Sequence, residues 1–149
     1  MIVNTAYIYM GVGGGGGGGG ETPVNPNLWQ DGIANYPVEL TDAAISSAGL
    51  NFISKPGAAT FSELPLTYFN KLTLTGRTTG ATITAKVKIN INFYSGDNVL
   101  LGTATATFSK SGNSVAVDIP SSAKIQNAKI KIEKSAYGNS LTLSSALLS

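Results

Sequence analysis

The sequence predicts an all-β protein, an antiparallel β-sandwich or jelly roll preceded by an N-terminal anchor strand and a polyglycine tether. Three observations support this fold class. Apolar and polar residues alternate over residues 82–94, turn-forming residues recur along the rest of the chain, and 30 Ser and Thr residues contrast with only 12% charged residues. Alternation with a period of two places one strand face in a core and the other in water, and regularly spaced short strands are typical of sandwiches.

Residues 1–12 are predicted to be an anchor peptide with the alternating pattern of one β-strand. A lone strand cannot satisfy its own backbone groups, so it must pair with a sheet edge. We favour the edge of another protein, which would be joined by strand addition. The alternatives are that the strand returns to its own sandwich or frays. The residues expected to contact the partner are Ile2, Val3, Tyr7, Ile8 and Tyr9.

Residues 13–27 are predicted to be a Gly/Pro-rich tether. Eight consecutive glycines, including Gly13, Gly16 and Gly20, precede a segment with two prolines that should be extended. A glycine run cannot hold one shape by itself. It could be a passive spacer, or it could thread a crowded junction where no Cβ fits, as at the collagen axis. Threading is the reading we favour, and it predicts a homo-oligomer, with a trimer favoured.

Residues 28–149 are predicted to form the β-sandwich head. Residues 28–66 carry turn signals without a long alternating run, and a short helix is expected over residues 41–47 with Thr41 as its cap. Strands are expected at residues 71–75, 82–94, 99–108, 115–119, 128–133 and 140–144. The predicted core residues are Ile83, Val87, Ile89, Ile91, Phe93, Phe108, Val117, Ile130 and Ile132.

The composition argues against most catalytic chemistry. There is no cysteine or histidine, so thiolate nucleophiles, the commonest proton shuttle and the commonest metal ligands are missing. The eight acidic residues are scattered singly, and a net charge of +2 is too balanced for nucleic-acid binding. We therefore expect no enzyme activity and no cofactor. Calcium bound by Asp97, Asn98 and Asp118 is a weaker alternative, because such sites need six or more oxygen ligands.

No segment has the length of a membrane span or the pattern of a signal peptide, so the protein is expected to be made and kept in a cytosol. Exposed aromatic side chains are the remaining candidates for ligand contact, since an aromatic ring can stack on the apolar face of a sugar. The candidates are Trp29, Tyr94 and Tyr137, with Tyr36 and Tyr68 as weaker ones. Packing in the core or at its rim is the stronger reading of aromatics at these spacings, and Tyr94 alone lies clearly on a polar strand face.

Residues 71–76, 93–97, 115–120 and 130–132 carry the alternation and turns by which residues 64–143 resemble the jelly-roll modules of carbohydrate-binding and galactose-binding-like domains. The order of anchor peptide, glycine run and small β-head resembles small virion proteins of tailed bacteriophages, such as head fibres, capsid decoration proteins and tail appendages. These resemblances imply a non-enzymatic structural protein of a virion, attached to other virion proteins through residues 1–12. The alternative is a tail-fibre or baseplate module that recognises host-surface glycans.

Overall fold

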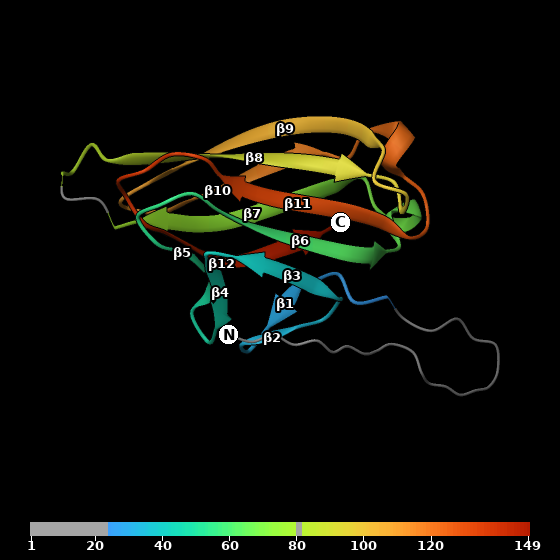
Figure 1. The fold of residues 1–149 in the computed structure, drawn as a ribbon, viewed down its shortest axis with the longest axis horizontal. Helices are drawn as coiled ribbons and strands as arrows, with labels where there is room; N and C mark the ends of the chain where they lie inside the picture. The colour runs from blue at the N-terminus through green and yellow to red at the C-terminus, as the bar shows by residue number, and fades with distance from the viewer. Residues whose placement is uncertain (1–23, 80–81) are drawn as a thin grey trace.

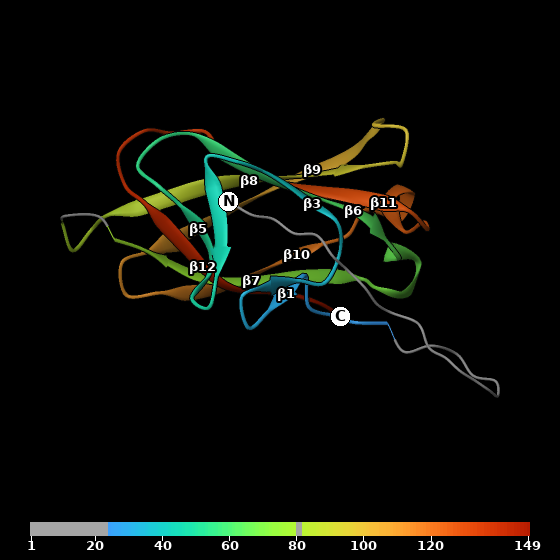
Figure 2. The same ribbon diagram turned by 60° about the horizontal axis from the view of Figure 1, so that its bottom comes forward.

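Two five-stranded antiparallel sheets pack face to face in the computed structural model, which describes residues 24–79 and 82–149 (Figure 1). The predicted all-β sandwich of jelly-roll type is confirmed. The first sheet has the strand order β10-β7-β12-β5-β4, and the second has the order β3-β6-β11-β8-β9. Figure 2 shows the two layers one above the other, with the small β1–β2 hairpin beside the first sheet.

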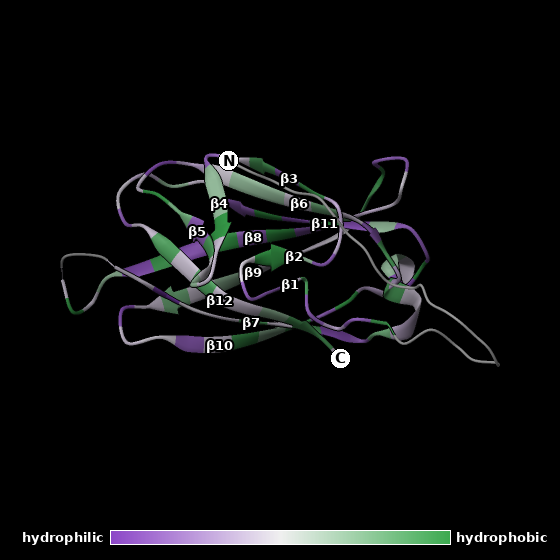
Figure 3. Ribbon diagram, turned by 90° about the horizontal axis from the view of Figure 1, so that it is seen from below, coloured by the Kyte–Doolittle hydropathy of each residue, from purple (hydrophilic) through white to green (hydrophobic). Residues whose placement is uncertain are grey.

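The strands in chain order are β1 (Trp29–Gln30), β2 (Ile33–Ala34), β3 (Val38–Thr41), β4 (Ala43–Ser46), β5 (Gly49–Phe52), β6 (Gly57–Leu64), β7 (Lys71–Thr78), β8 (Lys86–Tyr94), β9 (Leu100–Ser109), β10 (Asn113–Asp118), β11 (Ala128–Lys134) and β12 (Leu141–Leu148). Two short 3-10 turns, η2 (Leu66–Tyr68) and η3 (Ser121–Ala123), lie in the connections. Hydrophobic and hydrophilic residues alternate along most of these strands in Figure 3, as expected where each sheet has one buried face.

The core lies between the sheets, where apolar side chains from both inner faces meet. Eight of the nine predicted core residues are buried there. The exception is Ile83, which is 88% exposed. Its segment forms a turn in which the amide of Ala85 donates to the carbonyl of Thr82, and β8 begins only at Lys86. The prediction that the strand starts at residue 82 was therefore wrong.

The helix predicted over residues 41–47 is absent, because these residues form a corner between two strands. Asp42 adopts a positive φ of 49° between β3, which belongs to the second sheet, and β4, which belongs to the first. The chain thus changes sheets at Asp42, and the apolar residues on either side are half-buried in different layers. The long strand β6 in the same region was also missed, because small residues such as Ala58 and Ala59 weaken its alternation.

The described chain packs against the sandwich from its first residues. Val24 contacts the core, the carbonyl of Pro26 accepts the amide of Leu148, and the amide of Leu28 donates to the carbonyl of Ala146. These bonds lie along the part of β12 that extends beyond its pairing with β5. The packed sandwich therefore begins earlier than the boundary at residue 28 that the sequence predicts. The anchor of residues 1–12 and the glycines lie outside the described residues.

Candidate functional site

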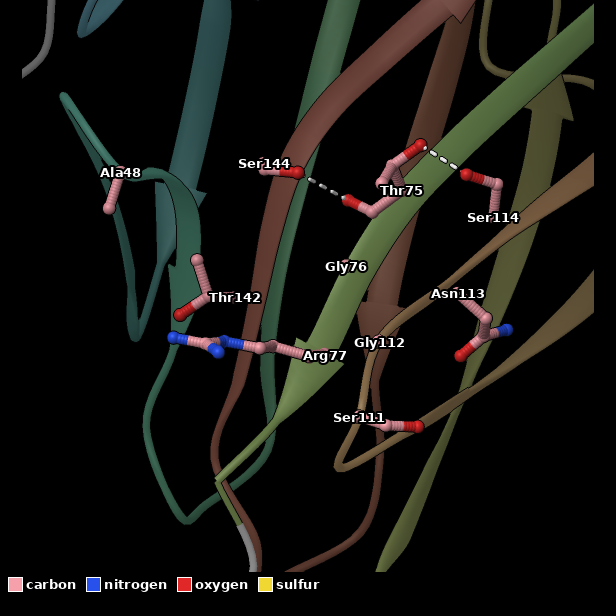
Figure 4. A pocket seen from close by; sticks show the side chains of 10 residues that line it. All are labelled: Ala48, Thr75, Gly76, Arg77, Ser111, Gly112, Asn113, Ser114, Thr142 and Ser144. Carbon is pink, nitrogen blue, oxygen red and sulfur yellow. Dashed lines mark hydrogen bonds between the residues drawn. The ribbon is translucent and has the colours of Figure 1, made fainter.

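A hollow of about 560 Å³ lies on the outer face of the first sheet. Its floor is formed by β7 and β12, which contribute Thr75, Arg77, Thr142 and Ser144. One wall is the turn between β4 and β5, and the other is the turn between β9 and β10 with the start of β10. The remaining lining residues are Ala48, Gly76, Ser111, Gly112, Asn113 and Ser114. Figure 4 shows these side chains around the hollow.

Glycines allow the two walls to approach the floor. Gly49 has a φ of +121°, and a Cβ atom there would collide with the backbone carbonyl oxygen of Leu143. Gly112 has a φ of +92° and lies beside Gly76 and Arg77. Positive φ values are costly for residues with a Cβ, so glycine is the residue these turns require. The backbone shape of both walls of the hollow therefore depends on these two glycines.

A β-bulge shapes the floor. The pairing of β12 with β7 shifts register between Leu143 and Ser145, which leaves Ser144 unpaired in the ladder. The Ser144 hydroxyl donates to the carbonyl of Thr75 at 3.2 Å, and the Ser144 carbonyl accepts the indole N–H of Trp29 at 3.3 Å. Bulges often re-aim a side chain beside a binding site. Here the bulge brings Ser144 to the lining of the hollow.

Hydroxyl groups dominate the polar chemistry of the hollow. Thr75 Oγ1 and Ser114 Oγ share a hydrogen bond of 2.7 Å across β7 and β10, and Thr142 Oγ1 donates to Asn51 Oδ1 at 3.0 Å. A hydroxyl that donates its proton in this way keeps lone pairs that can accept a bond from a ligand. The amide of Asn113 is already used within its turn, where it bonds Ser109 and Thr107.

Arg77 is the charged residue of the lining. Its side chain is exposed and extends from β7 across β12 towards Thr142 (Figure 4). The ion pairs among the described residues join Lys55 to Asp42, Lys71 to Asp118 and Lys131 to Glu133, and none of them includes Arg77. The guanidinium can therefore offer its planar set of N–H donors to a ligand in the hollow.

The sequence matches no protein-family model and no curated protein. Among solved structures, the fold is similar to the ligand-free form of BiXyn10A CBM1, with a TM-score of 0.63 and 10% identity over 85% of this chain and 97% of that one. It is also similar to a variant of CBM29-2, a family 29 carbohydrate-binding module, with a TM-score of 0.57 and 14% identity over 83% and 89% of the two chains. At these identities the similarity shows a shared fold.

The structure does not bring the three predicted glycan-contacting aromatics together. Trp29 is 4% exposed and stacks on Phe61 at a ring distance of 5.8 Å, so its ring packs in the core, as the stronger reading had it, and is not available to a ligand. Tyr94 ends β8 and is half-buried on the outer face of the second sheet. Tyr137 is 79% exposed in the connection from β11 to β12. Because Tyr94 pairs with Lys129 at the start of β11, it lies at the opposite end from Tyr137.

Tyr36 and Tyr68, the two weaker aromatic candidates, also differ in exposure. Tyr36 is buried and donates its hydroxyl to the carbonyl of Asn25, whereas Tyr68 is exposed in η2. Of the calcium candidates, Asp118 pairs with Lys71 at 2.6 Å and Asn98 accepts a bond from Lys129. Within residues 24–79 and 82–149 there is no group of three acidic, histidine or cysteine side chains suited to a metal ion.

The residues that line the hollow were missed by the sequence analysis, although one signal was present. Arg77 is the one arginine in a chain with nine lysines, and it stands on an outward strand position among threonines. The residues near Arg77 in the hollow come from turns and strands that are distant in the sequence. Alternation within one strand cannot show that such segments lie together. No helix in the described part of the chain has the length and apolar character needed to cross a membrane.

Proposed function

We propose that this chain is a non-catalytic glycan-binding module whose saccharide site is the hollow on the outer face of the first sheet. The observation that carries this proposal is a recess of about 560 Å³ that is rich in hydroxyl groups and shaped by a bulge and two glycine turns. Sugars present many hydroxyls that both donate and accept hydrogen bonds, and hydroxyl side chains complement both functions. The similarity in fold to two carbohydrate-binding modules supports the same reading.

The lining supports binding rather than catalysis. It contains no aspartate or glutamate, while glycoside hydrolysis ordinarily uses a pair of carboxyl groups flanking the scissile bond. The hollow also contains no aromatic ring, so affinity would come from hydrogen bonds and the guanidinium. The outer face of the second sheet, with Tyr94 at the end of β8, is the competing position for a saccharide.

A glycan array probed with the full chain tests the function, and paired variants test its position. Thr142→Val removes a hydroxyl from the hollow and is expected to weaken binding of any retained glycan about fivefold, the effect of roughly 1 kcal/mol. Thr105→Val removes a hydroxyl from the outer face of β9 and should leave binding unchanged. Loss of binding in Tyr94→Ala together with normal binding by Thr142→Val would place the site on the second sheet instead. An array without any retained glycan would reject the function.

We further propose that residues 1–12 attach the module to a virion, with residues 13–20 between them and the sandwich. The alternating apolar peptide before eight glycines supports this part of the proposal. A variant that lacks residues 1–12 is expected to keep the unfolding midpoint of the full chain and to lose incorporation into purified particles. Incorporation at the normal level would show that attachment uses another surface.

A further inference from the structure

The hollow carries positive charge, and its lining supplies no acidic side chain that would neutralise it. Arg77 lines it, Lys110 precedes Ser111 in the turn that forms one wall, and the lining includes no acidic residue. The three ion pairs of the described residues hold their carboxylates on other lysines. A ligand that enters the hollow therefore meets a guanidinium without a carboxylate partner among the described residues.

The side chains around Arg77 indicate which polar atoms of a ligand would bind to which residue. Thr142 donates its hydroxyl proton to Asn51, and one hydroxyl of the Thr75–Ser114 pair donates to the other, so the oxygens of all three retain acceptor capacity for ligand hydroxyls. Arg77 has donors alone and needs an acceptor. Its planar fork matches the two oxygens of a carboxylate, which gives shorter and stronger bonds than a neutral hydroxyl does.

Resting on the glycan-binding function above, we propose that the hollow selects acidic saccharides, in which a sugar carboxylate pairs with Arg77 and ring hydroxyls bond to Thr142, Thr75 and Ser114. The ligand class is thus a sugar acid of the uronate or sialate type, terminal or within a chain. The sugar ring would occupy the floor over β7 and β12, between the two glycine turns.

Titration calorimetry of the full chain with matched ligand pairs tests this selection. The pairs are sialyllactose and trigalacturonate, each against its own carboxyl methyl ester, which keeps the sugar rings and removes the negative charge of the carboxylate. At least one acidic member is expected to bind about tenfold or more tightly than its neutral counterpart, and added salt should reduce the difference. Arg77→Gln should remove the preference, and Arg77→Lys should restore part of it. Lys88→Gln, on the outer face of the second sheet, should keep the preference.

The outcomes separate this inference from the proposed function. Equal binding of acidic and neutral members, or a preference that survives Arg77→Gln, would overturn the inference while glycan binding stands. If the acidic sugars do not bind but neutral glycans are retained on the array, the inference is also wrong. Equally tight binding of inorganic sulfate or of a sulfated sugar would mean that Arg77 recognises anions without selecting a sugar carboxylate. If no saccharide binds in either experiment, both proposals fail.

Discussion

Lys134 is a lysine whose side chain is 1% exposed, which is rare for a charged residue. Its ammonium donates to the carbonyl of Ala136 at 2.7 Å and to the carbonyl of Lys55 at 3.3 Å. These carbonyls belong to the loops that follow β11 and β5, so one cation joins two loops at the same end of the sandwich. Burial lowers the pKa of Lys134 below its ordinary value.

The lowered pKa of Lys134 makes stability depend on pH with a definite sign. Between the lowered pKa and the ordinary one, the unfolded chain binds more protons than the folded chain, so the free energy of unfolding rises with pH in that window. Below the lowered pKa the full cost of the buried ammonium is present. Lys134→Met should remove this rise. The difference in unfolding free energy between wild type and variant should therefore move in favour of the wild type as pH approaches about 10.4.

Urea denaturation at several pH values measures that difference, and Lys88→Met is the matched control because Lys88 is exposed on β8. The change with pH should be larger for Lys134→Met than for the control. A flat difference for Lys134→Met, or one that favours the variant at alkaline pH, would show that the Lys134 pKa is not lowered.

At the scale of elements, β8 shows why alternation overestimates the length of a strand. The apolar pattern continues back to Ile83, but the ladder with β9 ends at the pair of Lys86 and Ser109, where β9 turns towards β10. A strand can extend only as far as its neighbours supply hydrogen-bond partners. The position of that end depends on another strand, so the local pattern could not predict it.

Two isoleucines on the two sides of this boundary allow a direct comparison. Ile89→Ala removes a fully buried side chain and should lower the free energy of unfolding by about 2 to 5 kcal/mol. Ile83→Ala removes an exposed side chain and should change it by less than about 0.5 kcal/mol. Equilibrium urea unfolding measures both, and equal losses would mean that Ile83 is buried in solution.

The turn between β4 and β5 is a second element whose geometry can be tested. Gly49→Ala combines a positive φ with a collision against Leu143, and it should cost more than the roughly 1 to 3 kcal/mol of backbone strain alone. Gly138→Ala is matched in φ, at +114°, but has open space around the added methyl group. It should cost the strain alone. Equal losses of unfolding free energy in the two variants would show that the turn can move away from β12.

For the whole molecule, the sequence predicted the class of architecture better than the site. Alternation and turns predicted the sandwich and eight of nine core residues, because each depends on neighbours within one strand. The hollow is assembled from two turns and three strands, β7, β10 and β12, which strand order alone brings together. Trp29 stayed among the candidates for glycan contact because nothing in its local sequence shows that its ring stacks on Phe61 and that its indole N–H bonds to Ser144.

The N-terminal boundary of the folded unit can be tested with two truncated chains. A chain of residues 24–149 keeps every packing contact described for the N-terminal segment, so its unfolding midpoint in urea should equal that of the full chain. A chain of residues 29–149 loses the fully buried Leu28 and the hydrogen bonds to Ala146 and Leu148 along the edge of β12. Its free energy of unfolding should fall by about 3 kcal/mol or more. Equal stability of the two truncated chains would show that residues 24–28 lie on the sandwich without supporting it, and that the folded unit begins at Trp29.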